Sequence, residues 1–369
     1  MRIRSYDFCL REFAGALGDF GTLIPFTIGY IVVCGLNPTG ILLGIGLTNI
    51  FLALFYRLPL PVQPKKAIGT IAIANKWPAS RVFGAGFGVG MIWLVLAVAR
   101  VGHVLNKIPK CVIRGIQLGL AFILALAGAE MLKENLHLAV PLLAISLLLL
   151  RNRVLPTAIF LILLGFVIAW LEGTLQLSTL KVTLDLPSLH TFSLDDLVYG
   201  LAYAGIAQVF LTLTNAVLAT IALVHDLFPD RMDVTPQNLI VNMGLMNVVT
   251  PFIGGMPLCH GAGGLAAQHL FGARTGGALI MEGTLEIILA LLFSQSILAI
   301  FTAFPLAVIG VMLFLAATEL GRVSLDLETK EEIFIMALTA LISATFNIAI
   351  GFVSGLLVYL GVKKGLIRV

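Results

Sequence analysis

The sequence predicts an all-α polytopic membrane protein of about fourteen segments, built as two inverted seven-segment repeats. Composition is the first observation: 59% of the 369 residues are hydrophobic and 11% are charged, with a mean hydropathy of +1.04. A soluble domain carries about 25% charged residues. The second observation is a proline-rich break followed by a short apolar run, found in residues 59–74 and again in 254–268. The third is a shared offset, since Pro61 and Pro257 lie 196 positions apart and so do Pro109 and Pro305.

The stretch 254–268 (GGMPLCHGAGGLAAQ) is the centre of this interpretation. Its apolar run is too short to cross a bilayer core of ~30 Å, and non-helical backbone at that depth must be buried in protein or line a wet cavity. We therefore expect an extended lead-in and a half-helix that begins near His260. The free N–H groups and positive dipole end of such a helix form an anion site. Paired interrupted segments in two halves mark the binding site of a transporter.

The remaining segments follow from the apolar runs. In the first repeat, residues 1–172, we expect segments at 13–33, 39–56, 62–74, 82–104, 111–131, 136–150 and 155–171. In the second repeat, residues 197–369, we expect them at 197–224, 239–252, the half-helix after His260, 276–292, 297–318, 333–348 and 350–362. The connection 173–196 is polar with some alternation, which favours a small extracellular ribbon or a surface helix.

Basic residues predict the orientation of the chain. The acidic connection falls on one side of the predicted topology, and by the positive-inside rule both termini are therefore cytoplasmic. Lys76 and Arg81 are exceptions, and residues 326–332 form an acidic cytoplasmic loop. The basic residues on the side of the termini are Arg2, Arg4, Arg11, Arg57, Arg100, Lys107, Lys110, Arg114, Arg151, Arg153, Lys363, Lys364 and Arg368.

Several other functional classes lack support in the sequence. The formal charge of +4 reflects loop placement and not nucleic-acid binding. The four cysteines fit neither a disulfide framework nor a metal motif, and Cys259 is expected to be a small packing residue. No HExxH pattern or nucleophile–base pair indicates an enzyme. No cofactor or metal is expected, and the glycines at 84, 86, 88 and 90 indicate close helix packing, not a nucleotide loop.

Three acidic residues fall inside apolar segments. Asp19 is a candidate for substrate binding or ion coupling, because an unpartnered intramembrane carboxylate costs on the order of several kcal/mol. The alternative is a carboxylate that caps backbone N–H groups at a helix break. Glu282 and Glu286 are i, i+4 neighbours on one helix face. They either pair with Arg274 or a lysine for structural reasons, which we favour, or serve a proton route.

The two breaks carry the residues expected to bind the substrate. Lys65 and Lys66 open the first half-helix, where a lysine is electrostatically misplaced unless an anion offsets its charge. Lys66 is the stronger ligand candidate, and the alternative for both is snorkelling to the interface. His260 follows the second break and is either a ligand or a hydrogen-bonded structural group. Gln63 and Gln268 are neutral donors of the kind an oxyanion site uses.

Polar and small residues complete the predicted site. Gln208, Thr212 and Asn215 follow i, i+4, i+7 spacing and so share one helical face, which points to a cavity or to helix–helix hydrogen bonds. Backbone at Gly261, Ala262 and Gly263 is expected to wrap the anion. Among the glycines, we expect Gly261 to face the ligand and Gly264, one turn later, to allow close packing.

These stretches resemble a known family. The matching sequences are GDFGTLIP (18–25), PVQPKKAI (61–68), LTLTN (211–215), DLFP (226–229), NMGLMN (242–247), MPLCHGAGGLA (256–266) and FGARTG (271–276). They resemble the molybdate transporter family of plants, algae and prokaryotes, a distant relative of the SulP sulfate carriers with the uracil-permease fold. Lys65 departs from the family pattern, where a methionine-like residue is expected, and the regulatory domain of SulP carriers has no counterpart here.

The resemblance implies a fold, an activity and partners. Segments 1–4 and 8–11 would form a core, segments 5–7 and 12–14 a gate, and the half-helices would meet N-terminus to N-terminus at the midplane. The implied function is secondary active uptake of a tetrahedral oxyanion, molybdate first, by an elevator-like movement of the core. A homodimer through the gate and a location in a prokaryotic plasma membrane are also implied. The alternatives are sulfate or another oxyanion as substrate, or a passive anion channel.

Coupling follows from the charge of the substrate. A dianion that enters against an inside-negative potential faces about 2.3 kcal/mol per charge per 100 mV. Protons are the simplest ions to move with it, and Asp19, Glu282 and Glu286 are the titratable candidates.

Overall fold

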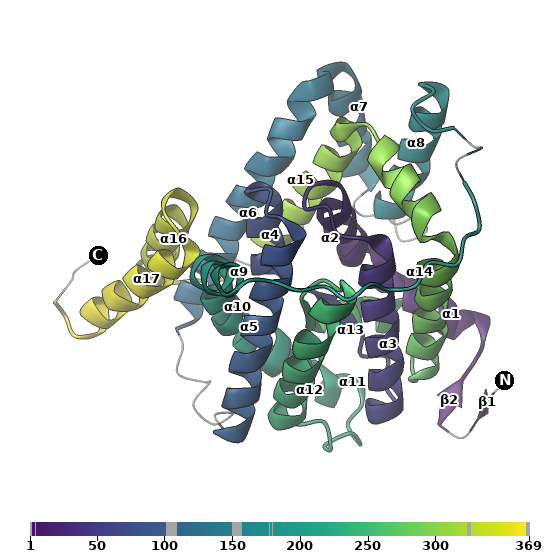
Figure 1. Cartoon of the computed structure of the whole chain (residues 1–369). Helices are drawn as coiled ribbons and strands as arrows, with labels where there is room; N and C mark the ends of the chain where they lie inside the picture. The colour runs from purple at the N-terminus through teal and green to yellow at the C-terminus, as the bar shows by residue number, and fades with distance from the viewer. Residues whose placement is uncertain are drawn as a thin grey trace.

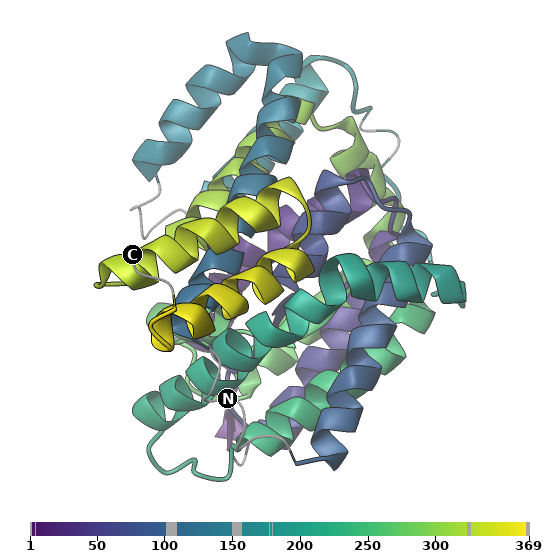
Figure 2. The ribbon, with the colours of Figure 1, turned by 90° about the vertical axis from the view of Figure 1, so that its left-hand side faces the viewer.

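The computed structural model describes residues 2–3, 5–100, 109–149, 157–176, 178, 180–322 and 326–366. These residues fold almost entirely into helices, with two short two-stranded sheets. Figure 1 shows α16 and α17 lying together at the left edge of the molecule, and in Figure 2 this pair faces the viewer. The all-α prediction is confirmed.

The first half of the chain contains seven of the predicted segments. A small hairpin of β1 (Arg2–Ile3) and β2 (Tyr6–Asp7) precedes a helix that bends by 55° near Asp19. This bent segment consists of α1 (Leu10–Ala16), η1 (Leu17–Asp19) and α2 (Phe20–Val32). It is followed by α3 (Pro38–Tyr56), β3 (Val62–Pro64), α4 (Lys66–Ala74), α5 (Ala79–Val98), α6 (Lys110–Leu132), η4 (Lys133–Asn135), α7 (Leu136–Leu149) and α8 (Thr157–Leu171).

The second half repeats this order of elements. Its first segment is one long helix with two π-helical stretches: α9 (Leu194–Gly200), η6 (Leu201–Gly205), α10 (Ile206–Thr212), η7 (Leu213–Leu218) and α11 (Ala219–Leu227). The rest are α12 (Pro236–Val249), η8 (Thr250–Ile253), β4 (Leu258–His260), α13 (Ala262–Phe271), α14 (Gly277–Ala303), α15 (Leu306–Arg322), α16 (Lys330–Thr345) and α17 (Ile348–Lys363).

The prolines that share the 196-residue offset occupy equivalent places. Pro61 and Pro257 each come directly before a strand, β3 or β4. Pro109 and Pro305 each come directly before a long helix, α6 or α15. Proline fixes its own φ and cannot donate a backbone hydrogen bond, so it suits the residue at which an element begins. Each half therefore runs through the same sequence of extended stretch, half-helix and proline-started helix.

One predicted boundary is wrong. The predicted segment 11 ends at residue 292 and segment 12 begins at residue 297, but α14 continues through these positions to Ala303 and α15 begins only at Leu306. The polar residues between the two predicted segments bind another part of the chain. Ser294 donates to Asp185 at 2.6 Å, and Ser296 donates to the carbonyl of Lys181 at 2.8 Å.

The connection between the two halves, which we call the strap, is neither the predicted ribbon nor the predicted surface helix. Residues 180–193 adopt no regular structure and cross over α3 and α5 in Figure 1. Their backbone instead bonds to helices, since Thr183 and Asp185 donate to the carbonyls of Leu292 and Leu291 at 3.1 and 2.8 Å. Ser193 then caps α9.

Helices that are distant in sequence pack closely. α3 lies along α14, α5 lies between α9 and α12, and α6 packs against α15 and α16. A methyl group on Gly90 would lie 2.9 Å from the backbone of Asn247, and one on Gly84 would lie 2.8 Å from that of Leu197. The predicted packing role of this glycine run is confirmed.

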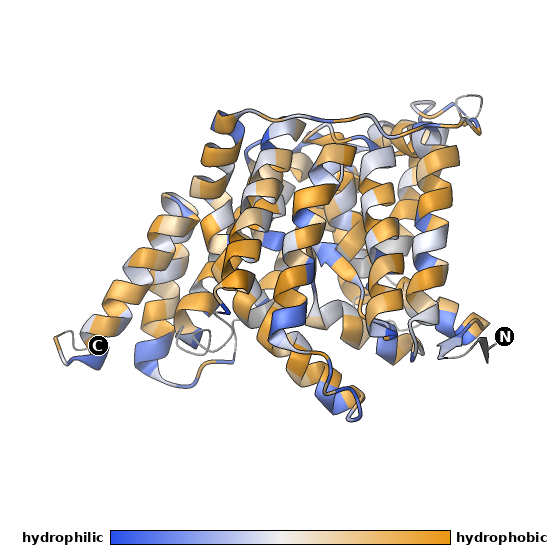
Figure 3. Cartoon of the chain, turned by 60° about the horizontal axis from the view of Figure 1, so that its bottom comes forward, coloured by the Kyte–Doolittle hydropathy of each residue, from blue (hydrophilic) through white to orange (hydrophobic). Residues whose placement is uncertain are grey.

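The outer surface suits a lipid environment. Hydrophobic residues cover much of the helices in Figure 3, and the strap lies on the side opposite β1 and the end of α17. Within the described ranges, five helices are long and apolar enough to cross a membrane, or six if the bent pair α1–α2 is counted as one span. The protein is an integral membrane protein.

Candidate functional site

The two interrupted segments meet in a ribbon at the centre of the molecule. Strands β3 and β4 pair antiparallel, with Gln63 opposite Cys259. Two asparagines satisfy backbone groups that the short ribbon leaves unpaired. Asn247 bonds both the carbonyl and the N–H of Leu258, at 2.6 and 2.9 Å, and Asn49 accepts from the N–H of Val62 at 3.1 Å. The predicted extended lead-in is confirmed, and its backbone has the partners that membrane depth requires.

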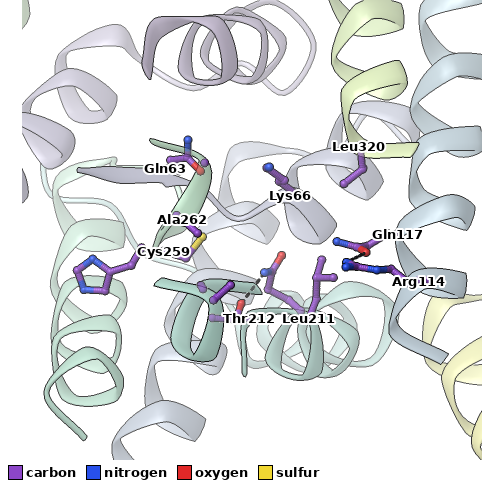
Figure 4. Close-up of a pocket in the computed structure, with 15 residues that line it drawn as sticks. Gln63, Lys66, Arg114, Gln117, Leu211, Thr212, Cys259, Ala262 and Leu320 are labelled. Carbon is purple, nitrogen blue, oxygen red and sulfur yellow. Dashed lines mark hydrogen bonds between the residues drawn. The ribbon is translucent and has the colours of Figure 1, made fainter. Parts of the chain in front are cut away.

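The half-helices leave this ribbon at opposite ends, because its strands are antiparallel. α4 begins at Lys66, and α13 begins at Ala262, two residues after the predicted His260. First-turn residues of both helices line one cavity of about 280 Å³, part of which Figure 4 shows. The cavity is lined by Gln63, Lys66, Arg114, Gln117, Gln208, Leu211, Thr212, Ala216, Ala219, Cys259, His260, Gly261, Ala262, Gly263 and Leu320.

The N-terminus of α4 is capped by a side chain from another helix. The side-chain oxygen of Gln208 accepts from the N–H of Ala67 at 2.7 Å and of Ile68 at 3.4 Å. Its amide nitrogen donates to Thr212 at 2.7 Å, so these two cavity residues share one face as predicted. Lys66, the first residue of α4, also lines the cavity. The side chain of Asn215, the third predicted member, lies outside the described residues.

The two adjacent lysines have different surroundings. Lys65 is fully buried, and its Nζ lies 5.7 Å from the centre of the Trp93 ring. This geometry is a cation–π contact. Lys65 is the extended residue that precedes α4, whereas Lys66 is the first helical residue, and only Lys66 lines the cavity. The departure from the family pattern at Lys65 therefore lies beside the site and not in its wall.

The N-terminus of α13 is built from small residues. Its cap is Gly261, which has no side chain to occupy the helix N–H groups. A methyl group at Gly263 would meet nothing within 4 Å, whereas one at Gly264 would lie 2.9 Å from both Asp19 and Pro61. Packing at Gly264 matches the expectation. At Gly261 the expectation needs correction, because a methyl group there would clash with the Gln63 side chain, and Gly263 is the glycine that faces open space.

His260 and Cys259 line the cavity from β4. The His260 side chain is fully buried, and its ring packs edge-on against Tyr56 with centroids 5.9 Å apart. Neither ring nitrogen of His260 has a hydrogen-bond partner among the described residues. The Cys259 sulfur lies 3.8 Å from the carbonyl oxygen of Pro64. The sequence predicts only a packing role for Cys259, but this residue also contributes to the cavity wall.

The three acidic residues are buried outside the cavity wall. Asp19, Glu282 and Glu286 are each at most 2% exposed, and none lines the cavity. Each carboxylate accepts a hydrogen bond from a carboxamide on another element. Gln63 donates to Asp19, Gln268 donates to Glu282 at 2.7 Å, and Asn49 donates to Glu286 at 3.2 Å. We call these three carboxylates with their three carboxamide partners the carboxylate cluster.

Two expectations change with this arrangement. Gln268 belongs to the carboxylate cluster and not to the cavity wall. The favoured pairing of Glu282 or Glu286 with Arg274 is wrong, because the Arg274 guanidinium donates to the carbonyls of His269 and Ala273. The predicted residues that do line the cavity are Gln63, Lys66, Gln208, Thr212, His260, Gly261, Ala262 and Gly263.

The opposite wall contains residues that sequence patterns did not identify. Arg114 and Gln117 reach toward the cavity from α6, and Leu320 reaches it from α15 (Figure 4). The sequence marks Arg114 only as a basic residue near the membrane surface. The i, i+3 spacing of Arg114 and Gln117 places them on one face of a helix. It does not reveal what that face meets.

Comparison with known proteins agrees with this architecture. A family model described as "Molybdate transporter of MFS superfamily" matches residues 11–124 and 200–320. Molybdate transporter 2 of Arabidopsis thaliana is 30% identical over 98% of this chain and 89% of its own length. This chain belongs to the molybdate transporter family. Molybdate transporter 1 of Arabidopsis thaliana is also 30% identical, over 95% of this chain and 87% of its own length.

Solved structures identify the fold of this family member. The transmembrane domain of a cyanobacterial bicarbonate transporter, BicA, matches with a TM-score of 0.68 at 14% identity, over 96% of this chain and 98% of that one. The murine anion transporter Slc26a9 in its inward-facing state matches with a TM-score of 0.74 at 12% identity, over all of this chain and 70% of that one. The family description names the MFS superfamily, whose halves are parallel repeats. The paired half-helices support the SLC26-type fold instead.

Proposed function

We propose that this protein is a secondary carrier that takes up molybdate through the cavity between the two half-helices. One observation carries the proposal: the first turns of α4 and α13 line the same cavity, with Lys66 in its wall. Helix N-termini attract anions through free N–H groups and the helix dipole. Thr212 adds a hydroxyl, and the small residues of α13 leave space beside the backbone. The relatives named as molybdate transporters support molybdate as the substrate.

The transport movement and the orientation are part of the proposal. The cavity lies between the segments assigned to the core (1–4 and 8–11) and α6 and α15 of the gate, so movement between these groups would expose it to one side at a time. The basic residues near both termini favour a cytoplasmic location for the N- and C-termini. The repeat boundaries at 1–172 and 197–369, a dimer through the gate and a prokaryotic plasma membrane stay predictions.

Uptake into proteoliposomes tests the substrate and the class of transporter. We expect saturable molybdate uptake that excess unlabelled molybdate suppresses more strongly than equal sulfate. Stronger suppression by sulfate would reassign the substrate to sulfate. Flux that grows linearly with concentration, together with anion currents, would indicate a channel and contradict the carrier mechanism.

We further propose that the carboxylate cluster couples uptake to protons. Its three buried carboxylates accept hydrogen bonds from neutral carboxamides and form no ion pair within the described part of the chain, and burying a carboxylate charge is costly. Binding a proton removes that cost. Gln63 links the two regions, because it lines the cavity and donates to Asp19. Asn49 links them a second time, since it bonds both Glu286 and the backbone of β3.

Neutral variants test this coupling. We expect Asp19→Asn, Glu282→Gln or Glu286→Gln to reduce the stimulation of uptake by an inward proton gradient. Glu130→Gln is the matched control, because Glu130 is a surface residue that pairs with Lys133 one turn away on the same helical stretch. Parental uptake that does not respond to an imposed proton gradient would contradict proton coupling and leave the molybdate site intact.

A further inference from the structure

The gate side of the cavity carries a cation that the proposed binding site does not yet use. Arg114 lies at the second turn of α6, and its side chain is only 14% exposed. It lines the same cavity as Lys66, but from the opposite wall (Figure 4). A dianion in this cavity would therefore have one cation on the half-helix side and another on the gate side.

A carboxylate already holds this guanidinium. Nε and Nη2 of Arg114 donate to the two oxygens of Asp326 at 2.8 and 2.7 Å. The remaining nitrogen, Nη1, donates to Gln117 at 2.9 Å. Asp326 lies in the connection between α15 and α16, and its side chain is 44% exposed. Arg114 thus makes a forked, two-oxygen contact with an acidic residue that does not itself line the cavity.

Arg114 could bind the proposed substrate through the same type of contact that it makes with Asp326. A guanidinium fork binds two oxygens of a carboxylate or of a tetrahedral oxyanion in the same bidentate way. It cannot bind both through the same two N–H groups. Asp326 therefore occupies one edge of the Arg114 guanidinium, formed by Nε and Nη2, and an oxyanion that used this edge would have to displace Asp326.

We propose that Arg114 is a second anion-binding station of the cavity, and that Asp326 is an internal competitor that the oxyanion displaces. This inference rests on the proposed function, because it assumes an oxyanion in the cavity. In this view the substrate passes between Lys66 on the half-helix side and Arg114 on the gate side. Asp326 returns to Arg114 when the station is empty.

A purely structural ion pair is the competing explanation. In that case Arg114 and Asp326 would only hold α6 to the α15–α16 connection. Lys110 offers a matched control, since its Nζ also contacts Asp326, at 3.0 Å, but does not line the cavity. Loss of the Arg114–Asp326 pair or of the Lys110–Asp326 pair would then lower stability without changing anion affinity.

The experiment measures molybdate affinity of the purified full-length protein and its variants by titration calorimetry. Asp326→Asn should bind molybdate about two- to fivefold more tightly, the range expected when a partly exposed competing ion pair is removed. Arg114→Gln should bind roughly tenfold more weakly, because hydrogen bonds to a charged group are lost. The double variant should match Arg114→Gln, and Lys110→Gln should match the parent.

The pH response adds a second measurement. The hydrogen bonds from Arg114, aided by Lys110, lower the pKa of Asp326 to about 2. When the pKa of a carboxyl group is lowered by an ion pair, the ion pair is fully present at every pH above the usual carboxyl pKa. It is lost only as the pH falls toward the lowered pKa. The gain from Asp326→Asn should therefore be constant between about pH 5 and 8.

The outcomes separate this inference from the proposed function. Unchanged affinity in both Asp326→Asn and Arg114→Gln, with weaker binding in Lys66→Ala, would overturn the second station and leave the main site. Unchanged affinity in all three variants would contradict the proposed site itself. If Asp326→Asn does not fold, Arg114→Lys still tests the proposal. It keeps the charge and loses the fork, so its affinity should fall between those of the parent and Arg114→Gln, and parental affinity would contradict the station.

Discussion

The two half-helices occupy equivalent places in the fold but end in different chemistry. The N-terminus of α4 carries a lysine in the cavity wall, and Gln208 already bonds two of its N–H groups. The N-terminus of α13 begins after a glycine and has open space at Gly263. In the proposed site, one half-helix would therefore supply charge, and the other would supply room and accessible backbone. A repeated scaffold can divide the work of binding one anion unequally between its copies.

Reversing the charge on α4 should have the largest effect. Lys66→Glu should abolish molybdate binding, and Lys66→Ala should weaken it roughly 10- to 100-fold, because a charged hydrogen-bonding group contributes about 1.5–3 kcal/mol. Lys65→Met is the control, since Lys65 contacts Trp93 away from the cavity. It should change affinity less than Lys66→Ala. Parental binding by Lys66→Glu, measured by calorimetry, would show that the α4 terminus does not supply the charge.

A negative charge at the cap of α4 should have the next largest effect. Gln208→Glu keeps the oxygen that accepts from the N–H of Ala67 and adds a negative charge. A negative charge near a helix N-terminus stabilises the helix by about 0.3–1 kcal/mol. Gln208 is only 2% exposed, so the cost of burying that charge exceeds this gain, and the melting temperature should fall. Molybdate affinity should fall at least tenfold, because like charges placed together cost several kcal/mol. Parental molybdate affinity in Gln208→Glu would instead assign Gln208 a purely structural role.

Added bulk on α13 should have the smallest effect, and it separates room from packing. Gly263→Ala puts a methyl group into open space, so affinity should fall about fivefold at parental stability, near the low end of a 1–3 kcal/mol steric cost. Gly264→Ala places its methyl group against Asp19 and Pro61, so stability should fall by about 1–3 kcal/mol. Thermal unfolding measures the stability of both variants, and calorimetry measures their molybdate affinity. Parental affinity in Gly263→Ala would show that the anion does not approach this glycine.

Sequence patterns predicted the scaffold well because membrane depth restricts what the chain can do. Apolar runs had to be helices, and the shared proline offset was enough to identify both interrupted segments. The break predicted near Ser294 is wrong for a physical reason. Polar residues inside a helix look like a loop until the strap residue Asp185 is known to bind them.

The site was predicted in part for a similar reason. Half-helix residues such as Lys66 and Gly263 could be named, because their positions follow from the local break. Gln268 was assigned to the wrong side of its helix, since spacing gives a face but not its neighbour. Arg114 was missed because its role depends on α6 meeting the half-helices, a contact between distant parts of the chain.

The ribbon also constrains how the protein is made. Gln63 of β3 pairs with Cys259, which the ribosome adds 196 residues later. At about 5–20 residues per second, β3 must wait roughly 10–40 s for its partner. During that time its unpaired backbone cannot remain in lipid at low cost. We therefore expect that the first half of the chain does not complete its insertion alone, and that closure of the ribbon is a late step that joins both halves.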